Sequence, residues 1–277
     1  MTRIAHISDT HFGMDDVPVC AALVNDLLRE APDLIVLTGD ITQRARRAEF
    51  RAAGAFLCSL APIPILALPG NHDLPLSDLL TRFIKPYRYY KQYIDPVLAP
   101  LWQGDEVAVL GVNSTRVLRH KHGFLPANIV QSVAQRLAEL PQPFKVVALH
   151  HPLAVITSDD RNNRVRAAEE ALDAWISAGA DLFLGGHIHL PYCIPASATS
   201  RQVVILQAGT AVSTRRRSGQ PNSFNLVCFE MNGGRRMLIE QRDYDLSAGI
   251  FVSRRVWKAT SSADGWVLFP DSRERSV

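Results

Sequence analysis

The feature that most constrains the fold is a series of short apolar runs, each of which ends in a polar cluster. Five clusters of His, Asp and Asn lie at residues 9–11, 39–40, 70–73, 150–151 and 186–189. They contain six of the nine histidines, so histidine is concentrated there rather than dispersed. Nearly continuous apolar runs are typical of strands that are covered on both faces, as in a parallel sheet. The pattern therefore predicts an α/β domain.

The apolar runs also predict where the polar clusters meet. The runs that precede them lie at residues 3–8, 34–37, 63–68, 146–149 and 182–184, and two more runs lead to Asn113 and Gly209. In open α/β sheets, ligands bind beyond the carboxyl ends of the strands. Because every cluster follows a run, we expect a single composite site at that edge.

The residue types in these clusters favour a metal site. Asp9 and His11 are two residues apart, as are His187 and His189, which suits convergence on one ion or on two neighbouring ions. Oxygen ligands mixed with imidazoles, without cysteine, suit Mn, Fe, Zn or Co. Each cluster alone is more typical of a turn, because Gly, Asn and Asp favour turns by themselves. The combination and order of all five indicate metal binding.

At these residues the chain resembles the calcineurin-like metallophosphoesterases. The shared order is Asp-x-His, Gly-Asp, Gly-Asn-His-Asp, His and Gly-His-x-His, and it covers roughly residues 1–235. The resemblance implies a four-layer αββα sandwich and a two-metal phosphoester hydrolase, with Mn, Fe or Zn as the expected ions. The implied ligands are Asp9, His11, Asp40 and His189 for one metal, and Asp40, Asn71, His150 and His187 for the other.

The same resemblance implies catalytic roles. A metal-bridging hydroxide would attack phosphorus, since two cations acidify a water and stabilise the attacking and leaving oxygens. His72 would contact the scissile phosphate and protonate the leaving group, and Asp73 would orient His72.

Three residues are weaker candidates for contact with substrate. His151 follows His150 and is expected either to support the metal ligands, to face the substrate, or to be an ordinary buried or surface histidine. Arg116 and Arg215 would recognise phosphate, which arginine binds through paired hydrogen bonds. For both arginines a solvated position in a turn is the alternative.

The expected domain is residues 1–240, with an aromatic insert at about 76–102 and a C-terminal extension of open role at 241–277. The insert contains four of the six tyrosines, interleaved with arginine and lysine. It is expected to cover the substrate or to pack on the sheet, and contact with a membrane surface is a third hypothesis. Apolar spacing predicts helices at residues 19–28, 44–60, 128–140 and 169–178.

The favoured function is that of a phosphodiesterase resembling the class III cyclic-nucleotide branch. The chain has Gly-Asn-His-Asp rather than the Gly-Asn-His-Glu of protein phosphatases, and the resemblance therefore favours the branch that acts on small molecules. A pyrophosphatase of nucleotide-sugar or lipid-linked diphosphates, a nuclease and a non-catalytic scaffold are the alternatives. The net charge of +3 suits a small anionic phosphoester and is too small to indicate nucleic-acid binding.

The remaining expectations concern location. The four cysteines are far apart, which indicates reduced thiols and a cytoplasmic protein. The N-terminus shows no charged leader followed by an apolar segment. No apolar run reaches the roughly 18 residues of a membrane span. The oligomeric state stays open.

Overall fold

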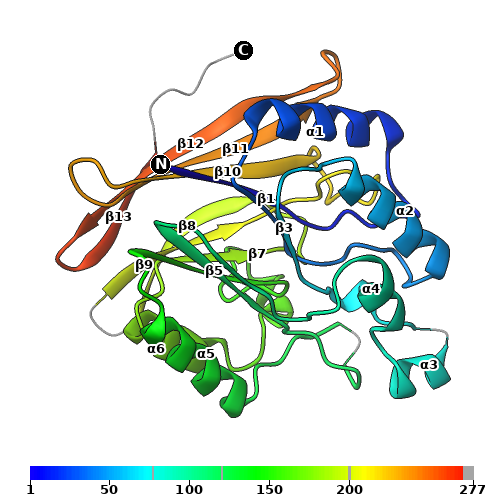
Figure 1. Cartoon of the computed structure of the whole chain (residues 1–277), viewed down its shortest axis with the longest axis horizontal. Helices are drawn as coiled ribbons and strands as arrows, with labels where there is room; N and C mark the ends of the chain where they lie inside the picture. The colour runs from blue at the N-terminus through cyan, green and yellow to red at the C-terminus, as the bar shows by residue number, and fades with distance from the viewer. Residues whose placement is uncertain (77, 120, 199–200, 271–277) are drawn as a thin grey trace.

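Two stacked halves of one sheet form the centre of the structure, a computed structural model that describes residues 1–76, 78–119, 121–198 and 201–270 (Figure 1). The strand order is β3-β2-β1-β10-β11-β12-β13-β9-β7-β6-β5-β4, with β8 paired to β9. Among the described residues, strand pairing joins the halves only where β13 meets β9, through the residue pair Gly265 and Gln202. The sheet therefore folds over at this link.

Each half has a parallel part. The first half contains β1 (Thr2–Ile7), β2 (Leu34–Leu37), β3 (Ile65–Ala67), β10 (Ser223–Glu230), β11 (Arg236–Asp245), β12 (Ile250–Ser262) and β13 (Gly265–Pro270). The second half contains β4 (Leu101–Gln103), β5 (Val107–Val112), β6 (Phe144–Leu149), β7 (Leu182–Gly185), β8 (Tyr192–Ala198) and β9 (Arg201–Gln207). β1, β2 and β3 are parallel, as are β5, β6, β7 and β9, so their carboxyl ends share an edge.

Helices cover the outer face of each half (Figure 1). They are α1 (Val17–Glu30) and α2 (Arg47–Cys58) on the first half, and α5 (Ala127–Glu139) and α6 (Ala168–Ser177) on the second. Two short helices, α3 (Leu79–Ile84) and α4 (Arg88–Tyr93), belong to the aromatic insert. The four helices expected from the sequence correspond to α1, α2, α5 and α6. α2 begins three residues later than expected, because the Glu49 carboxylate accepts hydrogen bonds from the backbone N–H groups of Arg44 and Arg46 and caps the helix there.

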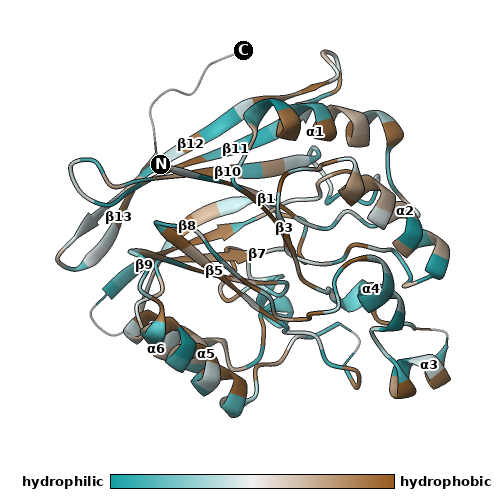
Figure 2. Ribbon diagram, in the orientation of Figure 1, coloured by the Kyte–Doolittle hydropathy of each residue, from teal (hydrophilic) through white to brown (hydrophobic). Residues whose placement is uncertain are grey.

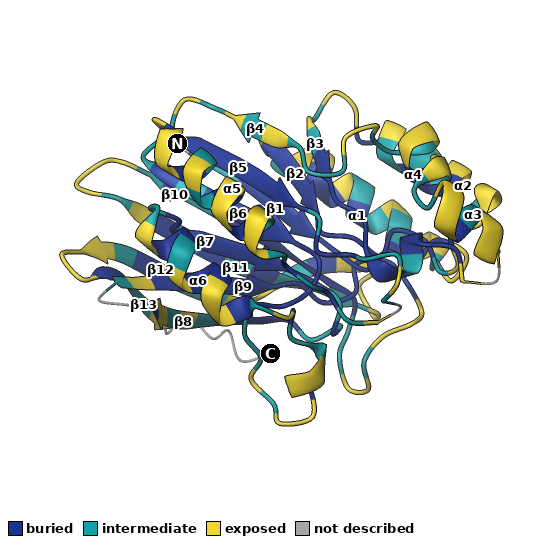
Figure 3. Cartoon of the chain, turned by 90° about the horizontal axis from the view of Figure 1, so that it is seen from below, coloured by how far each residue is buried: buried dark blue, intermediate teal, exposed yellow. Residues whose placement is uncertain are grey.

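Three separate apolar cores show that the expected four-layer sandwich is correct. Alternate residues of a strand point to opposite faces. Ile4 and Val36 therefore pack between the two sheet halves, whereas Ala5 and Ile35 pack under α1 and α2. Phe144 of β6 meets Phe229 of β10 across the central layer, with ring centroids 5.1 Å apart. The buried strands and the exposed outer helix faces are visible in Figure 3, and the same division by hydropathy in Figure 2.

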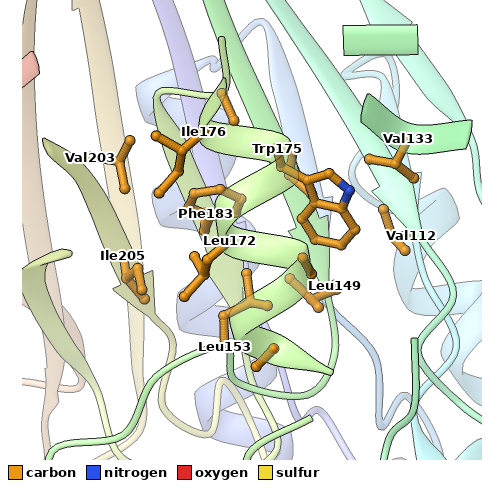
Figure 4. Close-up of a cluster of buried hydrophobic side chains, with 14 of the residues drawn as sticks. Val112, Val133, Leu149, Leu153, Leu172, Trp175, Ile176, Phe183, Val203 and Ile205 are labelled. Carbon is orange, nitrogen blue, oxygen red and sulfur yellow. The ribbon is translucent and has the colours of Figure 1, made fainter. Parts of the chain in front are cut away.

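The third core lies between the second half and helices α5 and α6. Figure 4 shows Leu172, Trp175 and Ile176 of α6 directed at the strands, with Phe183 among them. The buried Trp175 indole donates a hydrogen bond of 3.0 Å to the Val130 carbonyl of α5. This bond satisfies the polar atom of a buried ring and ties the two helices together.

The aromatic insert packs against the end of the first half. Tyr90 is buried, and its hydroxyl donates to the Ala67 carbonyl of β3 at 2.8 Å. The Tyr87 hydroxyl lies 2.6 Å from Thr115 Oγ1. Rings at these two positions therefore serve packing, while α3 extends beyond α4 at a corner of the molecule in the views of Figure 1 and Figure 3.

The last strands complete the first half of the sheet. Residue 240 falls within β11, and β12 and β13 continue the same sheet by antiparallel pairing. Tight turns join these strands as hairpins, which explains why antiparallel strands follow the parallel part. Residues 271–277 lie outside the described residues. None of the helices in the described ranges is long and apolar enough to cross a membrane.

Cysteine reactivity offers a test of this packing. Burial, together with Asp15 and Asp16, raises the pKa of the Cys20 thiol from 9.0 to about 12, whereas Cys58 is exposed. Only the thiolate reacts with alkylating agents. Below pH 9, the thiolate fraction at Cys20 is therefore roughly 1000-fold smaller than that of a thiol with a pKa of 9.0. We expect iodoacetamide at pH 8 to modify Cys58 first, as followed by peptide mass spectrometry. Equal rates at the two residues in folded protein would contradict the packing of α1.

Candidate metal centre

Seven polar side chains meet where five strands end, on the seam between the two sheet halves. Asp9 and His11 follow β1, Asp40 follows β2, Asn71 follows β3, His150 follows β6, and His187 and His189 follow β7. The first five of these residues are buried, and the last two are half-buried. The structure thus brings together every residue that the resemblance implied as a ligand.

Asp9, His11, Asp40 and His189 form the first group, and their ligand atoms all lie within 4.8 Å of one another. The Nε2 atoms of His11 and His189 are 3.1 Å apart. His189 Nε2 is also 3.2 Å from Asp9 Oδ1, and His11 Nε2 is 3.8 Å from Asp40 Oδ2. Two imidazoles and two carboxylates around one point form a donor set that can bind Mn, Fe or Zn.

His150, His151 and His187 form the second group, with ligand atoms within 4.8 Å of one another, and Asn71 and Asp40 lie beside His150. His150 Nε2 lies 3.1 Å from Asn71 Oδ1 and 3.2 Å from Asp40 Oδ1. The rings of His150 and His187 have centroids 5.1 Å apart. Asp40 therefore directs one carboxylate oxygen toward each group.

Hydrogen bonds on the far side of two histidines show that these groups fit metal ions. His150 Nδ1 is 2.7 Å from the Thr38 carbonyl, and His189 Nδ1 is 2.8 Å from the Arg215 carbonyl. Carbonyls only accept, so each Nδ1 carries a hydrogen and, in the neutral ring, each Nε2 is a lone pair. Both Nε2 atoms face carboxylate oxygens, which also only accept. A cation between such facing acceptors resolves the conflict.

Orphaned polar atoms lead to the same conclusion. Asp9 Oδ1, His11 Nδ1 and both ring nitrogens of His187 are buried without a hydrogen-bond partner. Buried polar atoms are rarely left unpaired in native proteins, and a missing ion is one accepted explanation. The residues present therefore fit a metal centre.

The local field is strongly negative. Burial would raise the pKa of Asp40, yet His150, His72 and His11 hold it well below its usual range. Burial opposes the charge on His150, but the carboxylates of Asp40 and Asp9 raise the pKa of that ring to about 9. A site that draws a proton onto a fully buried imidazole also attracts a metal cation in its place.

The ligands are held by strained backbone. Asp9, His11, Asp40, His187 and His189 all have positive φ, between 42° and 76°. Such conformations cost about 1–3 kcal/mol each and cluster at functional sites, where the surrounding structure enforces them. The backbone turns sharply after each of these strands, and the turn directs the ligand side chain toward the site.

Gly39 provides a test of this backbone. Its φ is +92°, and a Cβ there would lie 2.7 Å from His150 Nδ1 and 2.8 Å from the Gly70 nitrogen. Gly39→Ala is therefore expected to weaken metal binding by about 10–100-fold, the range seen when groups that orient ligands are disturbed. Metal titration followed by calorimetry measures the effect.

Gly219→Ala is the matched control for this prediction. Gly219 also has a positive φ, of +77°, but a Cβ there would meet nothing within 4 Å. We expect this variant to lose only the backbone contribution, about 1–2 kcal/mol of stability, and to keep its metal affinity. Equal metal affinity in the two variants would show that contact with His150 is unimportant.

His72 lies beside the metal ligands, at the pocket wall. Its backbone N–H donates to Asp40 Oδ1 at 2.8 Å, and its Nδ1 lies 2.8 Å from the Gln43 carbonyl. The Arg215 guanidinium donates to His72 Nε2 at 2.9 Å. The Gln43 carbonyl thus orients the ring, and Arg215 lies beside both ring nitrogens, 3.3 Å from Nδ1.

Asp73 is bonded to the backbone around this loop. Its carboxylate accepts hydrogen bonds from the N–H groups of Gly70, Ile41 and Thr42, and from the Thr42 hydroxyl. Asp73 therefore ties the loop after β3 to the loop after β2. The role expected for it, orientation of the His72 ring, is better described as positioning of the loop that carries His72.

A pocket of about 490 Å³ opens over the metal centre. Beside the ligands and His72, it is lined by Lys121, Asp160, Asn163, Ile188, Arg215, Arg216 and Arg217. Arg217 pairs with Asp160 at 2.8 Å, so this arginine is bound within the wall. Arg215 and Arg216 are exposed. Lys121, Asp160 and Asn163 were missed by the sequence analysis, because they belong to loops without a recognisable motif.

The other two candidates for substrate contact lie outside the pocket lining. Arg116 donates to the carbonyls of Asn113 and Thr115 and so stabilises its own turn. His151 is buried, with Nδ1 2.8 Å from Ser114 Oγ and Nε2 3.2 Å from the Lys121 carbonyl. Burial lowers the pKa of this ring to about 3. Both side chains therefore hold the loop at 114–121, and Arg215 alone of the three candidates lines the pocket.

Comparisons with known proteins agree with this geometry. The glycerophosphodiester phosphodiesterase GpdQ of Enterobacter lignolyticus is 31% identical over 169 residues, which cover 54% of this chain and 56% of that protein. A cAMP/cGMP dual specificity phosphodiesterase of Mycobacterium tuberculosis is 26% identical over 246 residues, which cover 78% of this chain and 72% of that protein. The chain thus spans little more than half the length of GpdQ.

A solved structure shares the fold. A dimetal phosphatase from Danio rerio superposes with a TM-score of 0.64 at 12% identity, covering 91% of this chain and 98% of that one. Residues 2–191 match the calcineurin-like phosphoesterase family, and they include every candidate metal ligand. With the αββα layers and the clustered ligands in place, the chain belongs to the calcineurin-like phosphoesterase family.

Proposed function

We propose that the protein is a phosphodiesterase that uses two metal ions to hydrolyse a small phosphodiester, such as a cyclic nucleotide or a glycerophosphodiester. The observation that carries this proposal is a pair of neighbouring ligand groups at the base of an open, cationic pocket, with one carboxylate oxygen of Asp40 near His11 and the other near His150. The names of the relatives support a diester rather than a monoester as substrate.

The ligands divide between two ions in this proposal. Asp9, His11, Asp40 and His189 would hold one, and Asp40, Asn71, His150 and His187 would hold the other, with Asp40 shared between them. When bound, two such ions lower the pKa of water and stabilise the charge on phosphate oxygens. Thr38 and Arg215 orient two of the imidazoles through their carbonyls.

His72 is proposed to deliver a proton to the leaving oxygen. Because Nδ1 donates to the Gln43 carbonyl, Nε2 is the atom that faces the pocket and accepts from Arg215. An incoming phosphate recruits the Arg215 guanidinium, which binds phosphate oxygens through paired hydrogen bonds. Nε2 then takes up a proton from solvent and passes it to the departing alkoxide.

A pyrophosphatase of a nucleotide-linked diphosphate is the second candidate, favoured by one observation. Lys121, Arg215 and Arg216 line the pocket beyond the metal ligands, so they can meet a second phosphate. In that case Arg216→Ala would lower kcat/KM for a nucleotide-linked diphosphate at least about tenfold, as loss of one charged hydrogen bond does. Turnover of a simple diester would be unchanged.

The deciding experiment compares bis-p-nitrophenyl phosphate with p-nitrophenyl phosphate, using protein stripped of metal and reloaded with Mn. We expect faster turnover of the diester, followed by hydrolysis of cyclic AMP or of a glycerophosphodiester. Preference for the monoester would reject the proposal in favour of a phosphatase. No turnover of any phosphoester by metal-loaded protein would support a non-catalytic role.

The cytoplasm is proposed as the compartment. Cys20, Cys58, Cys193 and Cys228 are all free thiols, which is typical of proteins in reducing compartments.

A further inference from the structure

An apolar surface lies at the corner of the molecule formed by α3. Of the six residues in this helix, four expose large apolar side chains: Leu79 is 60% exposed, Leu80 72%, Phe83 59% and Ile84 64%. The neighbouring Leu118 is 85% exposed. We call these five residues the α3 face. Figure 3 shows α3 largely exposed, and Figure 2 shows apolar residues on it.

The α3 face is built as one unit. Arg82, on the inner side of α3, is only 6% exposed. Its guanidinium donates to the Val117 carbonyl and to the Pro75 carbonyl, both at 2.8 Å. A longer bond of 3.5 Å reaches the Arg119 carbonyl. A buried arginine therefore joins the helix to the loop that carries Leu118, so the apolar residues are held outward together rather than left on a loose segment.

The charge in the segments that carry this face is mainly basic. Residues 79–94 and 107–138 contain eight Lys and Arg residues and no Asp or Glu. Lys85, Arg88, Lys91 and Lys121 are exposed among them. The nearest carboxylate before α3 is Asp78, which caps the helix by accepting hydrogen bonds from the Thr81 N–H and hydroxyl. Exposed basic residues therefore outnumber acidic ones in the segments that carry the apolar residues.

Apolar side chains beside exposed basic residues indicate what kind of partner the α3 face binds. A second copy docked through the same face would bring like charges together, because a symmetric dimer pairs a surface with itself. Exposed Leu, Phe and Ile beside Lys and Arg are typical of proteins that lie on a membrane surface, where the apolar residues enter the interface and cations meet lipid phosphates. Each basic residue near such a surface contributes further attraction. We propose that the α3 face docks on an anionic lipid surface.

Docking would place the pocket close to that surface. Leu118 and Lys121 belong to the same loop, and Lys121 lines the pocket over the metal centre. The Lys121 carbonyl lies 3.2 Å from His151 Nε2, next to the ligand His150. Leu118 of the α3 face and Lys121 of the pocket are thus three residues apart in the chain. This proposal does not depend on the proposed function.

The test is sedimentation of the full chain with vesicles. Wild-type protein is mixed with vesicles of phosphatidylcholine, with and without one third phosphatidylglycerol, at low and at high salt. We expect binding to the anionic vesicles at least about tenfold stronger than to the neutral ones, and weaker at high salt. The double variant Leu80→Ser/Phe83→Ser is expected to lose at least about tenfold of this binding, because two apolar side chains no longer enter the interface.

Leu246→Ser is the matched control, since Leu246 is 76% exposed on the turn between β11 and β12. It should bind vesicles as wild type does. Circular dichroism and hydrolysis of a soluble diester are measured without vesicles and show whether each variant is folded. Loss of vesicle binding by a folded variant can then be assigned to the substituted side chains. Absence of wild-type binding to anionic vesicles overturns the proposal, as does equal binding by the double variant. A concentration-dependent dimer that the double variant abolishes would instead assign the face to a second copy.

Discussion

Asp40→Asn is expected to lower kcat/KM for a phosphodiester by about 10³-fold or more and to reduce the bound metal below one ion per chain. Asp40 Oδ1 lies 3.2 Å from His150 Nε2, and Oδ2 lies 3.8 Å from His11 Nε2, so one carboxylate serves both ligand groups. Asparagine keeps the shape but removes the charge and one acceptor oxygen. Loss of metal-based charge stabilisation costs several kcal/mol of barrier, or about 10³-fold in rate.

Elemental mass spectrometry gives the number of bound metal ions per chain. Measured together with the rate, it shows whether activity is lost because metal is lost. Asp105→Asn is the control, because Asp105 is exposed and lies at the other end of β5 from the site. It should match wild type in both measurements. An Asp40→Asn protein with two bound ions and normal turnover would contradict the shared-ligand assignment and, with it, the proposed centre.

His72→Ala is expected to lower kcat about 10²–10⁴-fold for a substrate with a poor alkoxide leaving group, the usual range for loss of a general acid. The effect on bis-p-nitrophenyl phosphate should be much smaller, because p-nitrophenolate leaves without protonation. Metal content should stay near wild type, since the His72 side chain is bonded to Gln43 and Arg215 and stands outside the two ligand groups.

The comparison of leaving groups is what distinguishes this role from a structural one. A residue that only positions the loop would affect both substrates alike. An equal loss with the two substrates, at unchanged metal content, would therefore remove the proton-transfer role from His72. It would leave phosphate binding, shared with Arg215, as its function.

Much of the fold was predictable because buried strands and helices place apolar residues at regular spacings in the sequence. The apolar runs before Asp9, Asp40 and His150 correspond to β1, β2 and β6, and the helices predicted from apolar spacing correspond to α1, α2, α5 and α6. The resemblance added the second sheet layer. Local periodicity does not show that one sheet folds over at Gly265 and Gln202, because that link is a single pair between distant residues.

The contacts around the metal centre were less predictable. Gln43, Lys121 and Asp160 have no motif of their own, and each reaches the site through a loop whose course depends on distant packing. Arg116 and Arg215 looked alike in sequence, each an arginine shortly after an apolar run. Only the folded chain shows that Arg116 bonds its own turn, whereas Arg215 reaches His72 from the loop between β9 and β10.

The sequence by itself indicated the candidate metal ligands, because ligand chemistry resides in residue types and the clusters follow successive strands. It also indicated strands that are covered on both faces, whereas the four-layer architecture was implied by the family resemblance. The tertiary structure alone decided what surrounds the metals. It buried His151, bound Arg217 to Asp160, and left α3 exposed in a mainly basic segment. These outcomes depend on which loops meet in space, and this cannot be predicted from the separation of residues along the chain.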